Sequence, residues 1–181
     1  MTGRGGLFQF SIVHFQFIPM SVTTDTRPKT GPFIGAMTLI GFGMGGFVDA
    51  IVLHMLLQWH QMISNVLPPD TLLRKSVNMF WDGVFCAMTW TLTGLGIVLL
   101  WRQAGAARLP RSGKLFWGSL LLGWGVFNVL DSLVDHYLFG FHNVRENVPN
   151  KAAWNLGFLL LALTQIVTGW LMVQAGRRSV V

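Results

Sequence analysis

The chain has 181 residues, of which 52% are hydrophobic and only 11% are charged, and its formal net charge at neutral pH is +6. This composition excludes an ordinary soluble globular domain. The single cysteine, Cys86, excludes both an intramolecular disulfide and a metal site built from cysteines alone. We therefore predict an integral membrane protein in contact with the lipid bilayer.

The N-terminal segment covers residues 1–31 and shows no pattern of a spanning helix. Its apolar run is too short to cross a bilayer and is interrupted by Gln and His. We expect this segment to be cytoplasmic and disordered. Met20 opens a more ordinary cytoplasmic start than Met1, which raises the alternative that residues 1–19 do not belong to the natural protein.

Four longer apolar stretches follow, and each is long enough to cross the hydrocarbon core, which takes about 20 residues as a helix. They cover residues 32–62, 77–101, 115–140 and 154–173. We predict an all-α fold, an integral membrane four-helix bundle over residues 32–173. Residues 174–181 are expected to form a cytoplasmic tail.

The basic residues between the spans indicate the orientation. Nine of them lie in the N-terminal segment, the loop after the second span and the tail, whereas four lie in the other two loops. Because positive charge is enriched on the cytoplasmic side, we expect both termini in the cytoplasm and the other two loops outside. This distribution accounts for the basic pI without a nucleic-acid partner.

A repeat connects the first and third spans. Residues 41–62 read GFGMGGFVDAIVLHMLLQWHQM, and residues 123–144 read GWGVFNVLDSLVDHYLFGFHNV. Both copies start with glycines, which permit the close approach of a helix backbone or a flat porphyrin. Both then carry an Asp-x4-His-x5-His pattern, so we predict a parallel internal repeat of the first and third helices. The repeated polar residues are Asp49, His54 and His60, and Asp131, His136 and His142.

Ionisable side chains inside a membrane are costly and mark function, because each costs at least about 2.5–3.5 kcal/mol at the bilayer centre. Helix lengths place several of them at one level in the outer half of the membrane. We predict that these side chains bind a transition metal, either copper, zinc or iron. The candidate ligands are His54, His136, Asp82, Asp49, Asp131, Cys86 and Asp135.

Regular helix geometry assigns different parts to the repeated residues. At about 100° per residue, Asp49 and His54 lie about 140° apart and cannot bind one ion from one regular helix. His60 returns to the face of Asp49, but about 16 Å farther along the axis. We therefore expect His60 and His142 to be peripheral residues near the membrane surface.

The repeat of residues 41–62 and the block WDGVFCAMTW at residues 81–90 resemble a bacterial family of small four-helix membrane proteins, which is catalogued only as a domain of unknown function. The similarity covers residues 32–173. It implies a fold and a membrane location but no activity. Members of this family usually carry His at the position of Cys86, so the resemblance implies a metal ligand there and leaves the preferred metal open.

Two alternatives remain at this point. The first is a b-haem electron carrier in which His54 and His136 are the axial ligands. The second is a structural or proton-handling membrane subunit without metal. In the leading hypothesis, storage, redox chemistry and transfer to a membrane enzyme or metal-acceptor protein are all open, as is the question of whether any reaction is catalysed.

Overall fold

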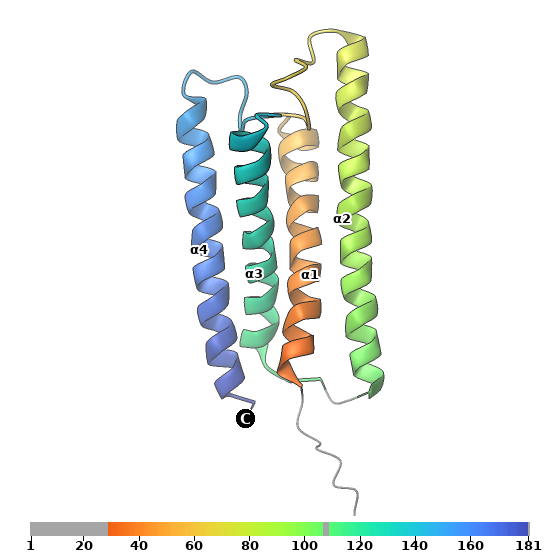
Figure 1. Cartoon of the computed structure of the whole chain (residues 1–181), viewed down its shortest axis with the longest axis vertical. Coiled ribbons are helices and arrows are strands. Elements are labelled where there is room, and N and C mark those ends of the chain that lie inside the picture. The colour runs from red at the N-terminus through yellow and green to blue at the C-terminus, as the bar shows by residue number, and fades with distance from the viewer. Residues whose placement is uncertain (1–28, 107–108, 181) are drawn as a thin grey trace, which may run out of the picture.

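The computed structural model describes residues 29–106 and 109–180, and this part of the chain is helical without strands. The expectations for the first 28 residues, including the start at Met20, lie outside the described residues. The helices confirm the all-α prediction (Figure 1). Their bounds are α1 (Thr30–Val48), η1 (Asp49–Leu56), α2 (Leu72–Ala106), α3 (Gly113–Asp131), η2 (Ser132–Leu138) and α4 (Lys151–Arg178).

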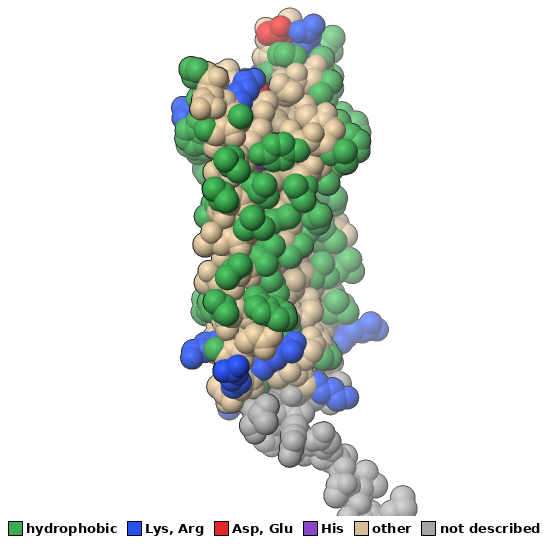
Figure 2. All heavy atoms as spheres, turned by 60° about the vertical axis from the view of Figure 1, so that its left-hand side comes forward, with side chains coloured by type: hydrophobic (Ala, Val, Ile, Leu, Met, Phe, Trp, Pro, Cys, Tyr) green, Lys and Arg blue, Asp and Glu red, His purple; other side chains and the backbone are tan. Residues whose placement is uncertain are grey.

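The bundle is organised around α1 and α3, which pack against each other in its centre (Figure 1). Helix α2 packs on α1, and helix α4 packs on α3. All four spans are long and apolar enough to cross a membrane. Apolar side chains cover the middle of the surface in Figure 2, while Lys and Arg gather near its two ends. These features describe an integral membrane protein whose outer helices present apolar side chains to lipid.

Glycines allow the two central helices to touch through their backbones. A Cβ atom on Gly41 would lie 2.1 Å from the carbonyl oxygen of Leu120, and one on Gly123 would lie 1.9 Å from that of Thr38. Both distances are far below van der Waals contact. The two glycines occupy equivalent positions of the repeat, so each copy supplies one half of the α1–α3 crossing.

The regular part of each central helix is shorter than its predicted span. The α-helical segments end at Val48 and Asp131, and the π-helical segments η1 and η2 continue them. The chain then turns at Gln58 and Gly140, which have φ angles of 50° and 61°. Such left-handed residues stop a helix and redirect the chain. Loops 57–71 and 139–150 follow, and we call the end of the bundle that carries them the histidine end.

Candidate metal centre

The π-helical segments explain the Asp-x4-His spacing. In a π-helix the backbone hydrogen bonds join residues five apart, as in the bond from Leu57 N to Val52 O of 2.8 Å. Residues five apart then lie on one face, and the His54 Nε2 atom is 3.0 Å from the Asp49 carboxylate. The expectation that these two side chains point 140° apart is wrong, because it assumed a regular α-helix.

The third helix repeats this arrangement. The backbone bond from Phe139 N to Val134 O measures 2.9 Å and matches its counterpart 82 residues earlier. The His136 Nε2 atom lies 3.3 Å from the Asp131 carboxylate. In each copy, the repeated aspartate and the first repeated histidine are therefore direct neighbours, which the sequence analysis did not predict.

His60 and His142 lie inside the protein and not at its rim. They are 3% and 1% exposed. His60 Nε2 is 4.0 Å from the Asp49 carboxylate, and His142 Nε2 is 3.7 Å from that of Asp131. The expected axial separation of about 16 Å does not occur, because the helix ends at Leu56 and the loop folds back into the bundle.

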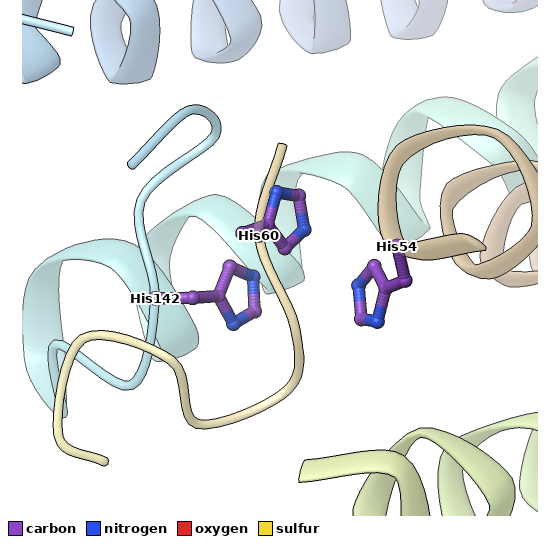
Figure 3. Close-up of side chains that lie close together, drawn as sticks. All are labelled: His54, His60 and His142. Carbon is purple, nitrogen blue, oxygen red and sulfur yellow. The ribbon is translucent and has the colours of Figure 1, made fainter. Parts of the chain in front are cut away.

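The two loops cross and fix the two imidazole rings. His60 Nδ1 donates to the carbonyl of Val144 at 2.8 Å, and His142 Nδ1 donates to that of Met62 at 3.0 Å. The rings stack in parallel with centroids 4.3 Å apart. Because a carbonyl only accepts, the proton of each neutral ring is on Nδ1 and the lone pair is on Nε2. Figure 3 shows these two rings and His54 facing a common space.

Asp82 supports His54 from helix α2. One of its carboxylate oxygens accepts from His54 Nδ1 and from the backbone N–H of Met62, both at 2.8 Å. A carboxylate behind a histidine orients the ring and leaves Nε2 available for a metal. The structure therefore brings Asp82 to the cluster as a positioning residue behind His54, whereas the sequence placed it among the ligands.

Helix α4 carries a counterpart that the sequence analysis missed. The backbone N–H of Val144 donates to the Asn155 side chain at 3.0 Å, as Met62 donates to Asp82. Three residues later, Phe85 and Phe158 each pack against a histidine of the cluster. The shared pattern Trp-Asp/Asn-x2-Phe begins at residues 81 and 154, and this pattern was the available signal.

Two predicted ligands lie outside the groups of donor atoms. Cys86 is half-buried and packs beside the apolar side chains of Ala50, Phe85 and Phe127. Asp135 is also half-buried. Among the described residues, neither one belongs to a group of donors close enough to share an ion.

The central observation is a set of buried polar atoms that lack hydrogen-bond partners among the described residues. Buried polar groups in proteins are nearly always paired, and exceptions call for an explanation such as an ion. The unpaired atoms include both carboxylate oxygens of Asp49, one of Asp131, both ring nitrogens of His136, and Nε2 of His54, His60 and His142.

Their donor atoms form two groups of three. In each group, all the atoms that would bind an ion lie within 4.8 Å of one another. His142 belongs to both groups. The first consists of His54, His60 and His142, and the second of Asp131, His136 and His142.

Electrostatics distinguish the two loop histidines. Burial, reinforced by neighbouring histidines, holds the pKa of His60 well below its ordinary value, so this ring is neutral and able to ligate. Burial also opposes the charged form of His142. The adjacent Asp131 carboxylate outweighs that effect and raises the pKa of His142. Protons therefore compete with a metal ion for His142 more strongly than for His60.

The cluster is reached from the histidine end. A polar cavity of about 370 Å³ lies between the two loops, and its lining includes His60, Gln61, Lys75 and Glu146. His60 is thus shared by the cavity and the cluster. Glu146 and His60 line this same cavity.

Comparisons with known proteins give a family and no activity. No curated protein and no solved structure matches the chain. A family model described as "Predicted membrane protein (DUF2243)" matches residues 36–176, which is well over half of the chain. The matched range contains every residue of both donor groups. The chain therefore belongs to this family of membrane proteins.

Proposed function

We propose that the protein is a membrane metalloprotein that holds a resident transition metal at its histidine end. The observation that carries this proposal is the convergence of buried, unpaired carboxylate and imidazole atoms. An unsatisfied buried polar group costs about 1–3 kcal/mol, and more if it is charged. Cations bound by these atoms would remove this cost.

The donor set narrows the choice of metal. Imidazole and carboxylate donors suit zinc, iron and copper(II). Cys86 lies outside both donor groups, so the softness of a thiolate carries no weight here. The donors are only 1–7% exposed, and such depth favours an ion that stays in place over one that is handed on to an acceptor protein.

The haem alternative has less support. Neighbouring backbone occupies the space beside the glycines that would admit a porphyrin, since Gly41 and Gly123 face Leu120 and Thr38. Buried aspartates beside the histidines also differ from the mostly apolar surroundings of a haem. An absorption spectrum tests this alternative, and a Soret band after haem-replete expression would establish it.

A metal-free role also has less support. A protonated His54 would pair with both Asp49 and Asp82, which lie 3.0 and 2.8 Å from its two nitrogens. A protonated His142 would pair with Asp131 in the same way, at 3.7 Å. These pairs leave the Nε2 atoms of His60 and His136 without hydrogen-bond partners among the described residues.

Elemental analysis tests the proposal. Protein purified in detergent without chelators should carry zinc, iron or copper, and added metal should raise its melting temperature, because a ligand of the native state stabilises that state. The double variant Asp49→Asn/Asp131→Asn should lose both properties. Asp70→Asn, which replaces an exposed carboxylate near the same end, is the matched control. Metal far below one ion per chain, with no thermal response, would refute the proposal.

We further propose that the histidine end faces the extracytoplasmic side of a bacterial inner membrane, on the basis of the nine-to-four distribution of basic residues. Alkaline phosphatase is active only outside the cytoplasm. A fusion after Pro69 should be active, and a fusion after Gly105 should be inactive. The opposite pattern would place the metal centre on the cytoplasmic side.

A further inference from the structure

We infer that the centre holds two metal ions, one in each half of the repeat, and that the ion of the first half binds more tightly. This inference rests on the proposed function. The first site consists of Asp49, His54 and His60. The second site consists of Asp131, His136 and His142.

The distances in the first site are compatible with one ion bound through both oxygens of Asp49. One oxygen lies 3.0 Å from the Nε2 atom of His54, and the other lies 4.0 Å from that of His60. Two ligands bound to one ion at about 2.0–2.2 Å each are separated by similar distances.

The second site has the same composition and similar spacing. The Asp131 carboxylate lies 3.3 Å from the Nε2 atom of His136 and 3.7 Å from that of His142. Two histidines and one carboxylate form a known ligand set for a metal that keeps open positions. Each half thus supplies a complete set.

A single ion would not satisfy all six residues. Among the described residues, the donor atoms that lie within 4.8 Å of one another form groups of three, and Asp49 belongs to neither group. One ion bound by three donors would therefore leave other buried donors unpaired. His142 belongs to both groups, so it lies between the second site and the histidines of the first.

The charge of the cluster is compatible with two ions. Asp49, Asp82 and Asp131 are buried together with four histidines. With neutral histidines, one divalent cation would leave a net charge of −1 and two would leave +1, so the cost of an uncompensated buried charge is no greater with the second ion.

The two sites differ in the residues behind their ligands. The Nδ1 atom of His54 donates to the Asp82 carboxylate at 2.8 Å. The Nδ1 atom of His136 has no hydrogen-bond partner among the described residues. A carboxylate behind a ligating histidine raises metal affinity by about 10–100-fold, so the first site should bind its ion more tightly.

Zinc titration of the metal-stripped, detergent-purified protein tests this inference. Calorimetry and elemental analysis should give two ions per chain, with dissociation constants that differ by about 10–100-fold. His136→Ala should retain one tight ion, and the matched variant His54→Ala should retain one weak ion. Melting temperatures of both variants identify any that do not fold.

Copper(II) provides a test that needs no variant. Two adjacent copper(II) ions should couple magnetically and give a half-field signal in electron paramagnetic resonance. Saturation at one ion per chain without this signal would overturn the inference and leave the proposed function standing. Two ions of equal affinity would overturn the order of binding, and no binding by the wild-type protein would overturn the proposed function itself.

Discussion

The molecule has two halves, residues 30–106 and 113–178. Their inner helices are closely similar to each other, whereas their outer helices are only loosely similar. On the inner helices, the glycines, aspartates and histidines recur at a constant offset of 82 residues. The π-helical hydrogen bonds and the left-handed turns recur at the same offset. On the outer helices, Asp82 in the first half corresponds to Asn155 in the second, and the connecting loop of the second half is shorter.

This difference separates the residues that would bind metal from the residues that hold the ligands in place. The residues that would contact the metal are duplicated, whereas the residue that orients a ligand from behind carries a charge in one half only. The two halves therefore present similar donors in different electrostatic surroundings. Substitutions that change one half at a time test this difference.

The largest loss of stability is expected at the α1–α3 crossing, where the two halves meet. Gly123→Ala would place a methyl group 1.9 Å from the backbone oxygen of Thr38, and Gly41→Ala would place one 2.1 Å from that of Leu120. Backbone atoms cannot move aside cheaply, so each change should cost about 3 kcal/mol of stability. Thermal melting in detergent measures this cost.

Gly94→Ala is the control for these glycines. A Cβ atom on Gly94 would meet nothing within 4 Å, so this change in α2 should be neutral or stabilise the helix by up to about 1 kcal/mol. Similar melting temperatures for Gly94→Ala and the two crossing variants would contradict the reciprocal contact.

Substitution of the two loop histidines should give the next largest effect, which is a loss of bound metal. His60→Ala should remove the ion of the first site, while His142→Ala should reduce both ions, because His142 belongs to both donor groups. Metal content per chain measures the two losses. Asn147→Ala, which changes the lining of the same cavity, should retain all metal. Full metal in both histidine variants would show that these residues are peripheral.

The residues behind the ligands should have smaller and unequal effects. Asp82→Asn should weaken the first ion by about 10–100-fold, because it removes the charge behind His54. Asn155→Ala should cost about 1 kcal/mol of stability through the lost hydrogen bond from Val144, with little change in affinity. Competition with a chelator measures the change in metal affinity, and thermal melting measures the change in stability. Equal losses of affinity in the two variants would contradict the proposed difference between the halves.

The smallest change in stability is expected at the two left-handed turns. Gly140 and Gln58 occupy equivalent left-handed positions, which cost a residue other than glycine about 1–2 kcal/mol. Gly140→Gln should lower stability by about 1 kcal/mol, since only Asn65 approaches the added Cβ, at 3.8 Å. Gln58→Gly should not lower stability. A stability loss in Gln58→Gly that exceeds the loss in Gly140→Gln would show that turn strain does not govern this position.

Much of the fold could be predicted from the sequence, because hydrophobic length and the repeat are properties of the chain itself. The glycines of residues 41–46 and their copies also indicated close helix contacts, as found at Gly41 and Gly123. These features depend on local composition and on the size of a single side chain.

The geometry of the centre could not be predicted in the same way, since it depends on a departure from the regular α-helix. A turn of π-helix brings Asp49 beside His54, and a left-handed Gln58 returns His60 to the interior. Regular-helix angles place Asp49 and His54 on different faces, and the regular-helix rise places His60 about 16 Å from Asp49. The five-residue spacing of Asp and His in both copies was the signal for a π-helix, and it was interpreted only through α-helical angles.

The most direct test of the metal centre is anomalous scattering from crystals of the metal-loaded protein. Two peaks are predicted at the histidine end. One should lie about 2.0–2.2 Å from the Nε2 atoms of His54 and His60, and the other at the same distance from those of His136 and His142. Peaks confined to Cys86 or to surface residues, with none within bonding distance of these four histidines, would contradict the proposal that the buried donors form a metal centre.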